Sequence, residues 1–186
     1  MHRNSVTRVL IADDHALIRK AVIAATQGEP DIVVVGEARD GDEAVNMVSA
    51  LRPDVIVMDL VMPKMNGLEA TNLICEQWPN AKVLAFSVAN EEEVFFAALR
   101  AGAIGYLTKA AEPSELIAAI RAAAEGESYL PPVLAERLVH HISTTDRYLV
   151  QWAEKLTPRE RDVLSLVGQG CTNRIIAEML GISSAT

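Results

Sequence analysis

At 186 residues, half of them hydrophobic, the chain has room for one full domain with a buried core and a second, smaller one. No apolar run reaches the roughly 18 to 20 residues of a membrane-spanning helix, and the N-terminal residues lack the apolar stretch of a signal peptide. The net charge of −8 lies in residues 1–127, with 11 Lys and Arg against 19 Asp and Glu, whereas residues 128–186 carry six of each. We therefore expect a cytoplasmic protein with no membrane partner, whose overall charge does not attract nucleic acid.

The first 125 residues alternate short apolar runs with amphipathic stretches, which is typical of βα units in an α/β fold with a parallel sheet. We expect strands near residues 8–12, 32–37, 54–58, 82–87 and 105–108. The pattern predicts helices between and after them, near residues 15–27, 42–51, 67–78, 91–101 and 114–125.

Polar residues stand at the ends of four of the five predicted strands. They are Asp13 and Asp14 after the first strand, Asp59 after the third, Ser87 at the end of the fourth and Lys109 after the fifth. Ligands of open α/β sheets bind at the carboxyl ends of the strands, so the fold would gather these side chains around one pocket. Three carboxylates, a hydroxyl and an ammonium group predict a site for magnesium and a phosphoryl group.

Asp59 is the predicted phosphoacceptor. A carboxylate that attacks a phosphoryl group needs a divalent cation to offset the charge, and Mg²⁺ is held by one or two carboxylates while it keeps several waters. We expect Asp14, Asp59 and the backbone carbonyl of Val61 to bind the ion directly, with Asp13 acting through a bound water.

Lys109 and Ser87 are predicted to bind the phosphoryl oxygens, one through a fixed positive charge and the other through a hydroxyl hydrogen bond. Phosphoryl transfer requires little beyond such positioning and electrostatics. Each residue taken singly also has a structural interpretation, as a helix cap, a turn residue or a solvated lysine. Their joint occurrence at the strand ends favours the functional one.

A second unit follows the α/β pattern. The segment 126–132 breaks the alternation and ends the first domain, and Thr157 with Glu160 forms a capping box at the start of a new helix. We expect a first domain at 1–127, a helical linker at 128–155 and a small all-α unit at 156–186. The adjacent His140 and His141 in the linker point about 100° apart on a helix, which favours a structural role over a metal site.

Residues 6–125 resemble the receiver domain of bacterial two-component response regulators. The resemblance rests on Asp13-Asp14, the segment 59–67 (DLVMPKMNG), Ser87, Tyr106 and Lys109. It implies a doubly wound, flavodoxin-like sheet of five parallel strands in the order 2-1-3-4-5, and phosphorylation of Asp59 by a sensor histidine kinase.

The resemblance also implies that Ser87 and Tyr106 form a switch, in which the hydroxyl moves toward the phosphoryl group and the aromatic ring swings inward. A strand tyrosine with its hydroxyl at the surface is the alternative for Tyr106. Many receivers have a proline in a cis peptide after the lysine, but Ala110 stands here and predicts a trans peptide. Val61 offers no polar group to orient a water, so we expect slow self-dephosphorylation.

Residues 156–186 resemble the helix-turn-helix output domain of the NarL/FixJ (LuxR-type) response regulators, notably in the segments TPRE at 157–160 and IAEMLGIS at 176–183. The resemblance implies a scaffold helix that holds a recognition helix in the major groove. We expect a partial domain that lacks the recognition helix, so DNA would be bound only through the complete output domain. The candidates for phosphate contacts are Arg159, Arg161 and Arg174.

These resemblances predict a response regulator that switches a DNA-binding domain to regulate transcription, forms a phosphorylation-dependent homodimer and is not an enzyme. The alternative is a stand-alone receiver that acts as a phosphoryl sink or dimerisation partner without binding DNA. A phosphatase of the haloacid dehalogenase type would need an aspartate two residues after the nucleophile, and Val61 stands there instead.

Overall fold

The computed structural model describes residues 6–88 and 92–137. The chain divides into two units, residues 1–135 and 136–186, and the elements below belong to the first. Each of them begins and ends within one residue of the predicted position. In chain order they are β1 (Thr7–Ala12), α1 (Ala16–Thr26), β2 (Ile32–Ala38), α2 (Gly41–Leu51), β3 (Val55–Met58), α3 (Gly67–Gln77), β4 (Lys82–Ser87), α4 (Glu92–Arg100), β5 (Gly105–Thr108) and α5 (Pro113–Glu125).

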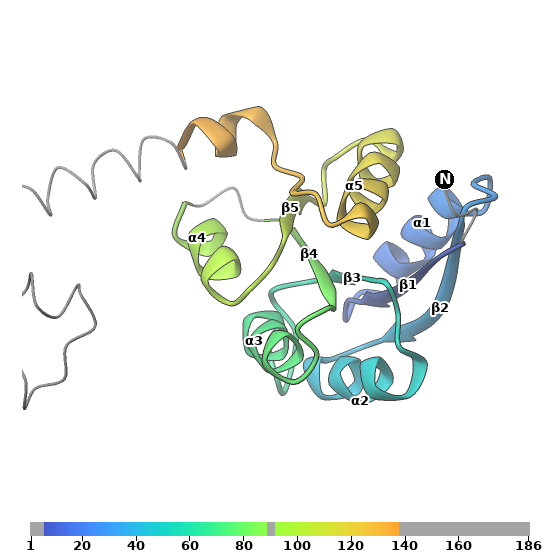
Figure 1. Cartoon of the computed structure of the whole chain (residues 1–186), viewed down its shortest axis with the longest axis horizontal. Helices are drawn as coiled ribbons and strands as arrows, with labels where there is room; N and C mark the ends of the chain where they lie inside the picture. Colours follow the sequence, from blue (N-terminus) through green and yellow to red (C-terminus); the bar gives the residue numbers. More distant parts are fainter. Residues whose placement is uncertain (1–5, 89–91, 138–186) are drawn as a thin grey trace, which may run out of the picture. The chain divides into compact units, whose positions relative to one another are not determined.

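The five strands form one parallel sheet in the order β2-β1-β3-β4-β5, which confirms the predicted doubly wound fold. Helices α1 and α5 cover one face of this sheet, and α2 and α3 cover the other (Figure 1). Because the sheet is buried on both faces, its central strands read as continuous apolar runs. Along β1, Val9 and Ile11 pack toward α5, whereas Leu10 and Ala12 pack toward α2 and α3.

The pairing of β1 with β2 contains an irregularity that affects the site described below. Val9 pairs with Val34 but Leu10 pairs with Gly36, so one residue of β2 has no partner in the register. After this shift Gly36 faces α2, where an added Cβ would lie 2.5 Å from Met47 and 2.8 Å from Leu51. Because successive strand residues point to opposite faces, Glu37 is directed toward the α1 side.

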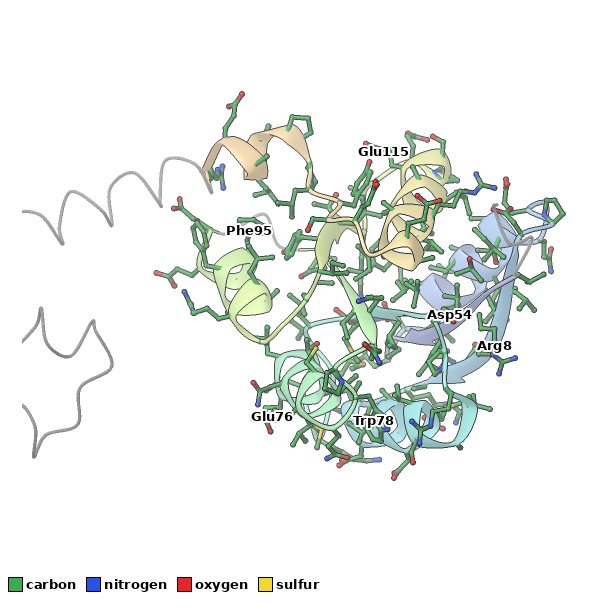
Figure 2. The ribbon with its side chains drawn as sticks, viewed as in Figure 1. Arg8, Asp54, Glu76, Trp78, Phe95 and Glu115 are labelled. Carbon is green, nitrogen blue, oxygen red and sulfur yellow. The ribbon has the colours of Figure 1, made fainter. Side chains whose placement is uncertain are left out.

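At the amino ends of its strands, the sheet is stabilised by hydrogen bonds that lie away from the predicted pocket. Arg8 in β1 donates its backbone N–H to a carboxylate oxygen of Asp54, just before β3, at 2.8 Å (Figure 2). The Arg8 guanidinium also donates to the carbonyl of Leu51 at the end of α2. These bonds tie β1 to the α2–β3 connection, at the opposite end of β3 from Asp59.

The segment after α5 packs against the edge of the sheet. Helix α5 ends at Gly126, which adopts a left-handed φ of 83°. The chain then passes β5, where the Tyr106 N–H donates to the carbonyl of Tyr129 at 2.9 Å, and Leu134 is buried. Residues 132–137 are helical. The expected boundary at residue 127 stays a prediction.

Several predictions lie outside the described residues: the greater part of the linker helix with His140 and His141, the helix-turn-helix unit at 156–186, and the candidate phosphate contacts Arg159, Arg161 and Arg174. Within the described part of the chain, no helix has both the length and the apolarity needed to cross a membrane.

Candidate functional site

A lysine and two aspartates form a buried cluster at the carboxyl end of the sheet. Asp13 follows β1 and Asp59 follows β3, and these strands are neighbours next to the point where the strand order reverses. Lys109, just after β5, places Nζ 2.7 Å from Asp13 Oδ2 and 2.7 Å from Asp59 Oδ2. The three side chains are only 7%, 1% and 4% exposed. One ammonium group therefore bridges two buried carboxylates that are 46 residues apart in the sequence.

The environment shifts the pKa of both Asp59 and Lys109. Burial raises the pKa of the Asp59 carboxyl, although the hydrogen bond from Lys109 and the N–H of Val61 act in the opposite direction. For Lys109, burial opposes the charge, but the bonds to Asp13 and Asp59 outweigh it and raise the pKa of the ammonium group. Lys109 is thus held in its charged form, beside a carboxylate that is a stronger base than an exposed one.

The acidic side chains are arranged so that they could bind a divalent cation. Ligand atoms of Asp13, Asp14, His15 and Asp59 all lie within 4.8 Å of one another. Apart from its ion-pair contact with Lys109, the buried Oδ2 of Asp13 receives no hydrogen bond from any described residue, which leaves lone-pair capacity for a cation. Asp14 is 32% exposed and opens the cluster to water. An oxygen-rich site that is open to solvent on one side suits Mg²⁺, which keeps several waters.

His15 belongs to this cluster, although the sequence interpretation did not include it. Its backbone N–H donates to Asp13 Oδ1 at 2.8 Å, and its Nδ1 lies 2.7 Å from Asp14 Oδ1. The ring is 68% exposed, so it forms the outer wall of the cluster. Its position directly after Asp13-Asp14 was the available signal, but a histidine that follows two aspartates is equally compatible with a helix start.

The loop from Asp59 to Gly67 holds the predicted phosphoacceptor in place. The Val61 N–H donates to Asp59 Oδ1 at 3.2 Å, and the Gly67 N–H donates to the carbonyl of Leu60 at 3.1 Å. A Cβ on Gly67 would lie 1.8 Å from the carbonyl oxygen of Asp59, so only glycine permits this close return of the chain. The capping box of Asn66 then starts α3. The Val61 carbonyl as a metal ligand stays a prediction.

Ser87 and Tyr106 lie on adjacent strands, β4 and β5, and both are fully buried. The Ser87 carbonyl accepts the backbone N–H of Lys109 at 2.8 Å, so the end of β4 also positions the lysine. The Tyr106 ring packs edge-on against Phe95 of α4, with centroids 5.5 Å apart and planes at 87°. The alternative of a surface hydroxyl on Tyr106 is wrong for this structure, because the whole side chain is buried at 0% exposure.

The peptide bond between Lys109 and Ala110 is trans, as expected, since there is no cis peptide bond in the described residues.

A second residue that the sequence interpretation missed is Arg19 in α1, which is only 8% exposed. Its guanidinium donates to the backbone carbonyls of Asp13 and Asp14. The available signal was its spacing from Val22 and Thr26, which places an arginine on the buried stripe of the helix.

Comparison with known proteins agrees with this geometry. Residues 9–121 match the family of response regulator receiver domains, and residues 154–186 match the bacterial regulatory proteins of the luxR family. The chain is 42% identical over 190 residues to the nitrate/nitrite response regulator protein NarL of Escherichia coli (strain K12), covering 100% of this chain and 86% of that protein. It is 38% identical to the transcriptional regulatory protein LiaR of Bacillus subtilis (strain 168), covering 96% and 84% of the two chains.

Among solved structures, a two-component response regulator of the LuxR family from Aurantimonas sp. SI85-9A1 superimposes with a TM-score of 0.70 at 33% sequence identity. That match covers 75% of this chain and 99% of the other. The family matches thus reach both parts of the chain, and the fold of the described residues agrees with the first of them.

Proposed function

This chain belongs to the two-component response regulators that join a receiver domain to a LuxR-type DNA-binding domain and control transcription, and we propose that phosphorylation of Asp59 switches it. The phosphoryl donor is a sensor histidine kinase. One Asp59 oxygen forms the new bond to phosphorus, while the bond from phosphorus to the kinase histidine breaks and the nitrogen keeps the electron pair.

The observation that carries this proposal is the contact of Lys109 with both Asp13 and Asp59 at 2.7 Å. When the phosphoryl group is attached, Asp59 no longer offers a free carboxylate, and the lysine can transfer its hydrogen bond to a phosphoryl oxygen. Its charge is fixed in place before the reaction, so little reorganisation is needed. Ser87 supplies a second donor from the end of β4.

Magnesium is the proposed cofactor, with Asp14, Asp59 and the Val61 carbonyl as direct ligands and Asp13 acting through water. The bound ion would offset the negative charges of the aspartates and of the incoming phosphoryl oxygens. The support is the convergence of the Asp13, Asp14 and Asp59 carboxylates within 4.8 Å. We propose no chemistry on external substrates, because phosphorylation and hydrolysis at Asp59 are the only reactions that this site needs to support.

The proposed switch passes through Ser87 and Tyr106 to α4 and β5. Its support is structural adjacency: Tyr106 contacts Phe95 of α4 through its ring and the carbonyl of Tyr129 through its backbone. A rearrangement at Tyr106 would thus reach both α4 and the segment that leads out of the receiver domain. We propose that the result is homodimerisation and control of the DNA-binding domain.

The remaining proposals follow from membership of the family. The receiver spans residues 1–127, the linker 128–155 and the LuxR-type unit 156–186, where Arg159, Arg161 and Arg174 would contact DNA phosphates. A regulator of transcription acts where the DNA is, which supports a cytoplasmic location.

The test is light scattering after size exclusion, with and without Mg²⁺ and beryllium fluoride, an analogue of the phosphoryl group on aspartate. We expect the wild-type chain to shift from monomer to dimer and Asp59→Asn to remain monomeric. The matched control is Asp54→Asn at the other end of β3, which keeps an acceptor for the Arg8 N–H and should shift like the wild type. Binding of beryllium fluoride by Asp59→Asn would refute the proposed acceptor.

A further inference from the structure

Arg19 is a buried charged side chain next to the acidic cluster of Asp13, Asp14, His15 and Asp59. It is on the first turns of α1 and is only 8% exposed. Its Nη1 donates to the carbonyl of Asp13 at 2.9 Å and lies 3.4 Å from the carbonyl of Asp14. The side chain thus contacts the backbone of two residues that are proposed to hold the metal, without touching their carboxylates.

These carbonyls need a donor because β1 ends before them. β1 stops at Ala12, and the last bond that ties this segment to β2 runs from the Asp13 N–H to the carbonyl of Ala38 at 3.1 Å. Helical side chains point back toward the helix N-terminus, so Arg19 can reach the turn that precedes α1. A buried carbonyl without a hydrogen-bond donor is unfavourable, and the Arg19 guanidinium supplies that donor.

Glu37 fixes the orientation of the guanidinium. Its Oε2 accepts a hydrogen bond from Arg19 Nε at 3.0 Å. The guanidinium is a rigid planar fork, so holding Nε on Glu37 determines where Nη1 points. Glu37 faces α1 because of the shift in the pairing of β1 with β2. Three separate segments, β2, α1 and the Asp13-Asp14 turn, therefore meet at this one group.

We infer that Arg19, oriented by Glu37, is a positioning residue for the metal site: it holds the Asp13-Asp14 backbone so that both carboxylates point to one cation. The inference rests on the proposed Mg²⁺ site and adds two residues to it. A role limited to stability would leave the metal preference of folded protein unchanged. A positioning role would not, because Mg²⁺ requires near-octahedral ligands at short distances whereas Ca²⁺ accepts flexible geometry.

The experiment measures Mg²⁺ and Ca²⁺ dissociation constants on the full chain, from amide NMR shifts of residues 13–15, well below the melting temperature. Groups that orient metal ligands typically change affinity by about 10- to 100-fold when they are removed. We expect Arg19→Met to weaken Mg²⁺ binding about tenfold and Ca²⁺ binding less, with Arg19→Lys partly restoring Mg²⁺ binding. Glu37→Gln should have a smaller effect in the same direction.

The matched control is Arg121→Met. Arg121 is also an arginine with two acidic partners, Glu29 and Asp31, but it joins α5 to the α1–β2 connection, away from the acidic cluster. Arg121→Met should change the melting temperature and leave the dissociation constants of Mg²⁺ and Ca²⁺ unchanged.

Unaltered Mg²⁺ and Ca²⁺ constants in folded Arg19→Met would overturn the inference. Should that variant not fold, Glu37→Gln decides instead, because Glu37 is 43% exposed and its replacement opens no core. Wild-type affinities in Glu37→Gln would then overturn the inference. A wild-type chain that binds no Mg²⁺ would refute the proposed metal site itself, and the inference with it.

Discussion

Replacing Lys109 by methionine removes the one ammonium group that, within the described residues, bridges the side-chain carboxylates of Asp13 and Asp59. Breaking a buried ion pair by deleting one partner typically destabilises a protein by about 3 to 5 kcal/mol, since an unpaired charge stays behind. Asp14 opens this cluster to water, which favours the lower end, about 3 kcal/mol. For a domain of this size that corresponds to a melting temperature lower by about 10 °C.

Magnesium should reverse most of this loss. The lysine and the metal both neutralise the same carboxylates, so Lys109→Met is expected to bind Mg²⁺ more tightly than the wild type. A ligand at about 100 times its dissociation constant stabilises the folded state by about 2.7 kcal/mol. Mg²⁺ at that level would recover nearly the whole deficit, although the variant would still lack the charge that holds the phosphoryl oxygens.

The assay is differential scanning calorimetry of both proteins in a chelator and in Mg²⁺. Lys64→Met is the matched control, because Lys64 also pairs with an aspartate, Asp40, but its side chain is 71% exposed. Water already solvates that lysine, so its loss should change the melting temperature little. If Lys109→Met melts at the wild-type temperature in the chelator, or if Mg²⁺ does not restore it, the proposed competition between lysine and metal is refuted.

Three further predictions concern Asp59 and its loop. Burial raises the pKa of Asp59 in the folded protein. The contribution of this carboxyl group to folding stability is therefore fully present below its pKa in the unfolded chain, about 4, and is lost as the pH rises through the folded pKa. Asp59→Asn should therefore be more stable than the wild type at pH 7 without metal, and urea titrations should show this advantage disappearing near pH 4; equal stability at pH 7 would contradict it. Gly67→Ala should destabilise the receiver by about 3 kcal/mol or more and abolish beryllium fluoride binding, because the new Cβ cannot lie 1.8 Å from the Asp59 carbonyl oxygen. An unchanged melting temperature and unchanged binding would contradict this. Val61→Asn should shorten the half-life of phosphorylated Asp59, because it gives the exposed rim of the site a group that can orient water. The half-life is measured by loss of radiolabel, and a value no shorter than in the wild type would count against the effect.

Much of the fold could be predicted because its signals are local. Buried parallel strands are apolar on both faces, so runs such as residues 55–58 stand out, and the helices between them follow from amphipathic spacing. Asp13, Asp14, Asp59 and Lys109 could be predicted as one site because each stands directly after a strand. Parallel topology alone brings those ends to the same edge of the sheet.

Other features could not be predicted because they depend on contacts between distant segments. The helical spacing puts Arg19 on the buried stripe of α1, but it does not reveal the partners of its charge. Only the folded chain supplies the carbonyls and the carboxylate that make its burial favourable. Likewise, Tyr106 suits either a surface or a core position on a strand. The packing of α4 decides it, by bringing Phe95 against the ring.

The sequence by itself thus determined the order of strands and helices and the chemistry available at the strand ends, since both depend on residue type and on spacing along the chain. Tertiary structure decided which atoms meet. The one-residue shift between β1 and β2 turns Glu37 toward Arg19, and the tight return at Gly67 fixes the Asp59 loop. Register and close approach are properties of paired segments, so they are settled only when those segments pack together.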